Sequence, residues 1–141
     1  MDWHARYVQQ ARWTGELRAY LFEKADAARA AAILEVGCGT GVILGEIVTR
    51  ASLHGLDLDP NVLTHCRFYV PSVSLVRADA LELPYPDGIF DLVYCHYLLL
   101  WVDDPLQALR EMKRVTRPGG NILALAEPDY FTRIDQPHEL V

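Results

Sequence analysis

The fold of this 141-residue chain is decided by the stretch Ile33-Leu34-Glu35-Val36-Gly37-Cys38-Gly39-Thr40-Gly41. Its apolar first half predicts a buried strand, and its alternating glycines predict a tight turn. Glycine is needed where the backbone takes a positive φ or lies directly against a ligand, so such a turn presents bare N–H groups to a bound molecule. Because the apolar-periodic segment 42–48 follows, the stretch indicates a strand, a turn and a helix beside a nucleotide-like cofactor.

The spacing of the glycines indicates which nucleotide is bound. The dinucleotide fingerprint G-x-G-x-x-G, counted from Gly37, needs a third glycine at position 42, where this chain has Val42. The run E-x-G-x-G-x-G from Glu35 to Gly41 instead resembles motif I of the class I S-adenosylmethionine (SAM) dependent methyltransferases. A nicotinamide-dependent dehydrogenase and a purely structural strand-to-helix turn remain the alternatives.

Length and composition indicate one globular domain, with 51% hydrophobic and 23% charged residues. No apolar run approaches the roughly 18 to 20 residues of a membrane span, and the N-terminus does not resemble a signal peptide. We therefore expect a cytoplasmic protein without a membrane partner.

The net charge of −6 argues against a nucleic-acid partner. A basic cluster at helical spacing is expected to be a solvated helix face: Arg110, Lys113, Arg114 and Arg117.

The cysteines argue against a disulfide framework and against a metal site. Cys38, Cys66 and Cys95 are an odd number without paired spacing, which indicates reduced thiols. Neither His65-Cys66 nor Cys95-His96 has the ligand gap of zinc motifs, so we expect no metal.

Along the chain, segments with the apolar spacing of helices alternate with segments that have the apolar pattern of strands. Residues 2–30 predict one long amphipathic helix with a break near Thr14 and Gly15. Beyond it we expect strands at 31–36, 52–58, 73–77, 89–95 and 121–126, helices at 41–50, 60–69 and 104–117, a loop at 80–88 and a turn at 118–120. Asp59 and Pro60 predict the start of the helix at 60–69, and the helix at 104–117 should bury Leu106, Leu109, Met112 and Val115. Five strands separated by helices predict parallel crossovers and a doubly wound α/β sheet.

Two further segments share the resemblance to these methyltransferases. Residues 83–93 are similar to the family run L-P-F-x-D-x-x-F-D-x-V, in which Phe90 would enter the core and Asp91 would be structural. Residues 111–120 are similar to E-x-x-R-V-x-x-P-G-G before the fifth strand. The resemblance covers residues 33–126 and points to the small-molecule and quinone-type methyltransferases. It implies a Rossmann-like parallel sheet of order 3-2-1-4-5, lacking the last two strands of the family.

The cofactor is expected at the carboxyl ends of the strands, where ligands bind in open parallel sheets. Asp57 lies 20 residues after Gly37, and its carboxylate suits both ribose hydroxyls, while Asp59 serves better as a helix cap. The resemblance implies that Leu58 packs on the adenine, that Asp79 takes the adenine amino group and that the Ala80 N–H meets a ring nitrogen.

The methionine moiety is expected beside the glycine turn. The turn itself would be formed by Gly37, Cys38, Gly39 and Gly41, and Glu35 suits the ammonium group or the N–H groups of the turn. The resemblance puts Cys95 and His96 near the methionine carboxyl end and the reacting methyl group. From the first helix, Tyr7, Arg12 and Trp13 would either fold over the cofactor as a lid or pack simply.

The resemblance implies methyl transfer from SAM to a small-molecule acceptor. The cofactor supplies the reactivity, so the protein mainly aligns the reactants and excludes water. His96 is the candidate base, with Tyr97 second, although a histidine beside an apolar run is equally a buried core residue. The alternative is a SAM-binding module, or a truncated fragment, without turnover.

The single domain expected at 1–141 divides into an N-terminal helix or lid at 1–30, a core at 31–127 and a tail at 128–141. Strand five would be an open edge, and open edges invite pairing unless they are covered. We expect self-association as a homodimer, or the tail, to cover this edge, unless the chain is a piece of a longer enzyme. Pro128 would limit the exposed length.

Overall fold

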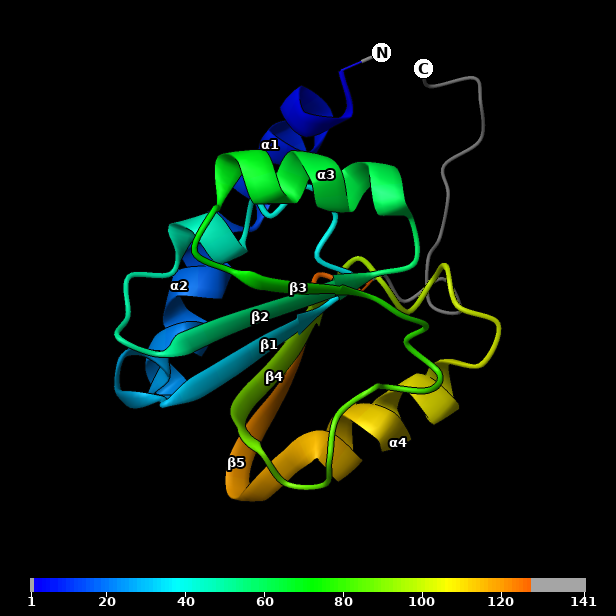
Figure 1. Cartoon of the computed structure of the whole chain (residues 1–141). Helices are drawn as coiled ribbons and strands as arrows, with labels where there is room; N and C mark the ends of the chain where they lie inside the picture. Colours follow the sequence, from blue (N-terminus) through cyan, green and yellow to red (C-terminus); the bar gives the residue numbers. More distant parts are fainter. Residues whose placement is uncertain (1, 128–141) are drawn as a thin grey trace, which may run out of the picture.

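The computed structural model describes residues 2–127, so the predicted tail and Pro128 lie outside the described residues. These residues form a five-stranded parallel sheet of order β3-β2-β1-β4-β5 (Figure 1). The strands are β1 (Ala32–Val36), β2 (Ser52–Asp57), β3 (Ser74–Arg77), β4 (Phe90–His96) and β5 (Thr116–Leu125). The predicted doubly wound sheet and its strand order are confirmed.

The central strand β1 is apolar on both faces because both faces are covered. Ile33 packs with the N-terminal helices, whereas Leu34 and Val36 pack with α4 (Pro105–Val115), and all three are fully buried. Figure 1 shows α4 on the opposite side of the sheet from the other three α-helices. Successive side chains of a strand point to opposite faces, and here both faces are buried. This explains why the apolar run in β1 is nearly continuous.

The glycine turn after β1 has the conformation that its sequence predicts. Gly37, Gly39 and Gly41 have positive φ angles of 74°, 51° and 81°. The expected helix at 41–50 is wrong, because only the short 3₁₀ helix η2 (Leu44–Glu46) forms there. The β-branched residues and the glycine of Val42-Ile43-Leu44-Gly45-Glu46-Ile47 have low helix propensity, which accounts for the difference.

The N-terminal segment breaks where expected. Helix α1 (Trp3–Trp13) ends at Thr14, and α2 (Gly15–Lys24) follows it. Asp26 has φ 53° and ends this segment before the short 3₁₀ helix η1 (Ala27–Arg29), so the predicted helix stops short of residue 30. Helix α3 (Pro60–Tyr69) has the predicted bounds and cap, because the Asp59 carboxylate accepts from Asn61 N at 2.8 Å.

Helix α4 and strand β5 differ in detail from the prediction. Met112 and Val115 are fully buried, but Leu106 is 56% exposed, because Ala108 instead lies on the buried face. Strand β5 begins at Thr116 and includes the predicted turn 118–120, where the register against β4 shifts.

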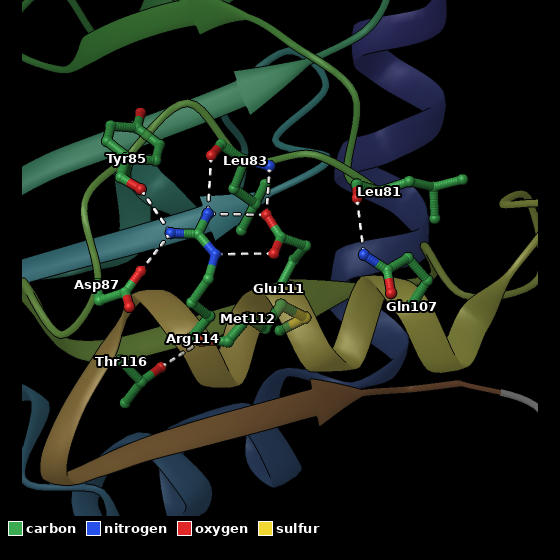
Figure 2. A network of polar contacts seen from close by, with 9 residues as sticks. All are labelled: Leu81, Leu83, Tyr85, Asp87, Gln107, Glu111, Met112, Arg114 and Thr116. Carbon is green, nitrogen blue, oxygen red and sulfur yellow. Dashed lines mark hydrogen bonds and ion pairs between the residues drawn. The ribbon is translucent and has the colours of Figure 1, made fainter.

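Arg114 joins α4 to the loop 80–88, which leads from β3 to β4 (Figure 2). Its guanidinium donates to the carbonyls of Leu83 and Tyr85 and to the carboxylates of Asp87 and Glu111, at 2.8 to 2.9 Å. Glu111 also accepts from Leu83 N at 2.8 Å, and the hydrogen bond from Arg114 lowers the pKa of this carboxyl. Arg114 therefore fixes a loop, which corrects its assignment to a solvated face.

Four further observations concern residues 2–127. None of their helices has both the length and the apolar character needed to cross a membrane. No group of three or more His, Cys, Asp or Glu side chains within this range is arranged to hold a metal ion. The three cysteines are free and buried. Asp91 accepts from Ala31 N and Ala32 N at 2.8 Å, so its carboxylate holds the start of β1.

Candidate cofactor-binding site

A cavity of about 380 Å³ lies where the carboxyl ends of the strands meet the glycine turn. Four segments line it: the end of β1 with the turn, the end of β2, the residues after β3, and the connection from β4 to α4. Tyr7 and Gln10 of α1 complete the lining. Of the predicted cofactor residues, the lining includes Glu35, Gly37, Cys38, Gly39, Asp57, Leu58, Asp79, Ala80 and Tyr7, together with His96.

Asp57 is directly bonded to the glycine turn. Its Oδ2 accepts from Gly39 N at 2.9 Å, and its Oδ1 accepts from Asp59 N at 3.0 Å. A carboxylate oxygen has more than one acceptor direction, so this acid holds the turn and still offers lone pairs to a ligand. The resulting surface combines a carboxylate with the cavity-lining backbone of two glycines of positive φ, Gly37 and Gly39, which suits the hydroxyls of a sugar and a polar tail.

Glu35 lies at the floor of the cavity and is only 2% exposed. Tyr94, its register partner on β4, donates its hydroxyl to Glu35 Oε2 at 3.0 Å. Burial raises the pKa of this carboxyl well above its usual value, and the Tyr94 hydrogen bond opposes the rise. A cationic group bound nearby would favour the ionised carboxylate again.

The partners of Glu35 correct one expectation. Within residues 2–127, the hydrogen bond to the Glu35 carboxyl comes from Tyr94 rather than from the N–H groups of the turn. Tyr94 was missed by the sequence analysis. Its signal was a tyrosine next to the apolar pair Leu92-Val93 of β4, where a buried hydroxyl needs a partner.

The opposite end of the cavity is lined by Leu58, Asp79 and Ala80. Leu58 is 59% exposed, which leaves an apolar side chain available to pack on a flat ligand. Asp79 Oδ1 accepts from Leu81 N at 2.9 Å and so shapes the turn that follows β3. Arg114 fixes the rest of this loop against α4, as described above.

The connection from β4 to α4 forms the far wall. His96, Tyr97, Leu98, Trp101 and Val102 line the cavity here, and Tyr97 has a positive φ of 53°. His96 Nε2 lies 2.9 Å from Thr14 Oγ1. Burial, and then the charge of Arg18, lower the pKa of His96 to about 4, so the imidazole is neutral at pH 7.

Helix α1 closes the site over the glycine turn. The Tyr7 ring lies so close to Gly39 that a Cβ at this glycine would be 3.3 Å from Tyr7 Cε2. His4 Nδ1 lies 2.8 Å from Thr40 Oγ1, and the His4 ring stacks on Tyr69 at 3.6 Å between ring centroids. These contacts bring the predicted lid residue Tyr7 onto the turn.

Four predicted residues do not line the cavity. Arg12 and Trp13 are exposed on α1 and are not among the lining residues. Cys95 is fully buried, and its thiol donates to Glu127 Oε1 at 3.5 Å. Gly41 belongs to the turn, but its α-carbon faces α3: a Cβ there would be 2.5 Å from Cys66 Sγ.

The sequence did not indicate a role for Arg18, which connects α2 with η2, with the end of α1 and, through Thr14, with His96. This side chain is only 4% exposed and donates to Glu46 Oε2 at 2.6 Å and 3.1 Å. The third guanidinium nitrogen, Nη1, donates to Ala11 O and Thr14 Oγ1, each at 2.7 Å. Arg18 therefore links α2 to η2 and, through Thr14, to His96.

Comparison with known proteins identifies the family of the chain. Residues 34–124 match the family described as a methyltransferase domain, and the chain belongs to this family. Its fold and cofactor are accordingly those of a Rossmann-like methyltransferase that uses S-adenosylmethionine.

The match with individual relatives covers only part of each relative's sequence. The malonyl-(acyl-carrier protein) O-methyltransferase of Halorhodospira halophila is 35% identical over 84% of this chain and 43% of its own sequence. The demethylmenaquinone methyltransferase of Shouchella clausii is 42% identical over 65% of this chain and 43% of its own. The chain thus spans less than half the length of these two relatives.

Solved structures repeat the fold. A SAM-dependent methyltransferase from Thermotoga maritima aligns with a TM-score of 0.61 and 26% identity, over 82% of this chain and 56% of that protein. The cyclase SpnF aligns with a TM-score of 0.66 and 27% identity, over 77% of this chain and 43% of that protein.

Proposed function

We propose that this chain binds SAM in the cavity and takes part in transferring its methyl group to a small-molecule acceptor. The observation that carries the proposal is the meeting, in one cavity, of the glycine turn, Glu35, Asp57 and the Asp79-Ala80 pair. The family of the chain supports the same reading.

The described side chains fit the parts of this cofactor. We assign Asp57 to the ribose hydroxyls, Leu58 to the adenine face and Asp79 with Ala80 to the adenine edge. Glu35 and the backbone of the turn would receive the methionine end, where an ammonium group would restore the charge that burial disfavours. When bound, the cofactor supplies an activated methyl group.

The contribution of the chain to the reaction is alignment and exclusion of water. Tyr7 covers the turn, and the connection after β4 forms the opposite wall. His96 is neutral and lies on this wall, so its Nδ1–H suits donation of a hydrogen bond to an acceptor. Removal of a proton by Nε2 would require the Thr14 contact at 2.9 Å to open first. The catalytic role of His96 stays a prediction.

The acceptor is proposed as a small molecule without negative charge. The described lining residues include the carboxyl side chains of Glu35, Asp57 and Asp79, and no Lys or Arg is among them. Acidic groups disfavour an anionic acceptor, whereas the aromatic rings of Tyr7, Tyr97 and Trp101 suit an apolar one. The acceptors in the names of the relatives differ: malonyl-(acyl-carrier protein) in one and demethylmenaquinone in the other.

We further propose a cytoplasmic location and a homodimer through the β5 edge. Within residues 2–127, β5 pairs with β4 alone, and it carries an exposed Ile122. An open edge of this kind favours pairing with a second chain. Light scattering that shows a monomer at high concentration would contradict the dimer.

Binding and turnover are tested separately. Isothermal titration calorimetry should show binding of S-adenosylhomocysteine and none of NAD, because the dinucleotide fingerprint is absent. A labelled-methyl assay over a panel of neutral acceptors then distinguishes an enzyme from a SAM-binding module without turnover. The likeness to SpnF, a cyclase, makes this second assay necessary, because the fold also carries other chemistry.

A further inference from the structure

The connection that follows β4 is held by a residue that follows the neighbouring strand β5. Glu127 comes two residues after the end of β5. Its Oε1 accepts from Leu98 N at 2.7 Å, and its Oε2 accepts from Leu99 N at 3.0 Å. The Cys95 thiol adds a weaker contact to Oε1 at 3.5 Å. One carboxylate therefore fixes two successive peptide N–H groups of the cavity wall.

The wall needs an external support because its backbone is strained. Tyr97 has a positive φ of 53°, a conformation that L-residues other than glycine adopt at a cost. Such a conformation persists only where neighbouring contacts determine it. The bonds from Glu127 act on the next two residues, and Tyr97 N itself donates to Leu125 O at 3.2 Å.

The held segment reaches the glycine turn directly. A Cβ at Gly37 would be 2.7 Å from Leu98 Cδ1, so Leu98 packs against the bare backbone of the turn. Leu98 also lines the cavity, next to His96 and Tyr97. A contact path thus runs from Glu127 through the Leu98 backbone and side chain to the turn.

We propose that Glu127 is a positioning residue: its carboxylate fixes the Tyr97–Leu99 backbone and thereby the cavity wall that faces the methionine end of the cofactor. The proposal rests on the proposed function for the identity of the ligand. The hydrogen bonds from Leu98 N and Leu99 N to Glu127 are independent of that function. A carboxylate is required, since it offers an acceptor to each N–H. In Glu127→Gln, the side-chain NH₂ replaces one carboxylate oxygen. This donor would then face the N–H of Leu98 or Leu99, and two donors cannot form a hydrogen bond.

The test compares Glu127→Gln with Glu23→Gln, the same change at an exposed position on α2. Calorimetry on the full chain measures S-adenosylhomocysteine binding, and amide hydrogen exchange by NMR measures protection at residues 97–99. We expect Glu127→Gln to weaken binding about tenfold or more and to speed exchange at Leu98 and Leu99, with the sheet amides unchanged. Glu23→Gln should resemble the parent in both measurements.

Two outcomes would overturn the proposal. In one, Glu127→Gln binds S-adenosylhomocysteine as the parent does. In the other, exchange at Leu98 and Leu99 is unchanged, or rises equally throughout the sheet, which would show general destabilisation. If the parent chain itself binds no S-adenosylhomocysteine, the proposed function fails, and the exchange measurement alone decides whether Glu127 holds the wall. Glu127→Asp, one methylene shorter, should recover little, since it does not span both N–H groups.

Discussion

The hydroxyl of Thr14 lies 2.9 Å from Nε2 of His96, which joins the break between α1 and α2 to the end of β4. Thr14 Oγ1 also accepts from Arg18 at 2.7 Å, so its single proton is available for the imidazole nitrogen. The carbonyl of Ala11 is a weaker acceptor for it, at 3.4 Å. This arrangement favours a neutral His96 with its proton on Nδ1, and the low pKa of His96 agrees.

The first prediction concerns stability against pH. The pKa of His96 is about 4 in the folded protein and about 6.5 in an unfolded chain. The unfolded state therefore binds more protons between these values, so the His96 contribution to stability is lost as pH falls from 6.5 towards 4. The raised pKa of Glu35 acts in the opposite direction, which makes a matched comparison necessary.

Urea unfolding of the parent and of His96→Gln at pH 7.5 and pH 5 provides that comparison. The parent should lose more stability on acidification than the variant, because Glu35 is common to both. Parallel losses would show that His96 is not held neutral.

The second prediction concerns Arg18. Arg18→Met should lower the free energy of unfolding by about 2 kcal/mol, because Glu46, Thr14 and Ala11 O each lose a donor. Arg29→Met is the control, since the Arg29 side chain is 86% exposed and its contact with Asp26 is 3.9 Å long. It should change stability by less than about 0.5 kcal/mol. Equal effects in chemical denaturation would argue against the Arg18 link.

The third prediction separates two glycines of the same segment. Gly41 has φ 81°, and a Cβ there would be 2.5 Å from Cys66 Sγ, so Gly41→Ala should cost about 2 kcal/mol or more. Gly45 has no positive φ, and its Cβ would lie 3.4 Å from Val70. Gly45→Ala should be neutral or stabilising by up to about 1 kcal/mol. Thermal unfolding of both variants tests the order.

The fourth prediction concerns the loop that carries the adenine-side residues. Arg114→Lys keeps the charge but loses the planar fork that reaches two carbonyls and two carboxylates. It should lower stability by about 1 to 2 kcal/mol. Arg110→Lys, at an exposed position of the same helix, should have no measurable effect. If both variants unfold alike, the network in Figure 2 contributes little.

The parts of the fold that the sequence predicted are those with local signals. The apolar run of β1, the glycines at 37, 39 and 41, and the Asp59 cap each act within a few residues, so they were readable. The helix at 41–50 was wrong because its apolar spacing was helical but its residue types were not.

The contacts that the sequence did not predict join distant segments. Thr14 meets His96 across 82 positions, and Glu127 meets Leu98 across 29. Neither pair has a spacing signal, since only the tertiary fold brings the partners together: Thr14 lies between two helices, and Glu127 follows the strand next to β4. The buried state of Arg18 was missed for the same reason: Glu46 lies 28 positions away.

The central claim is that Asp57 and the glycine turn form the cofactor site. The direct measurement is calorimetric titration of S-adenosylhomocysteine into the parent chain, Asp57→Asn and Asp59→Asn. Asparagine still caps a helix, so Asp59→Asn should bind as the parent does, whereas Asp57→Asn should bind at least about tenfold more weakly, or about 1.4 kcal/mol. Equal binding by all three folded proteins, or no binding by the parent, would contradict the account.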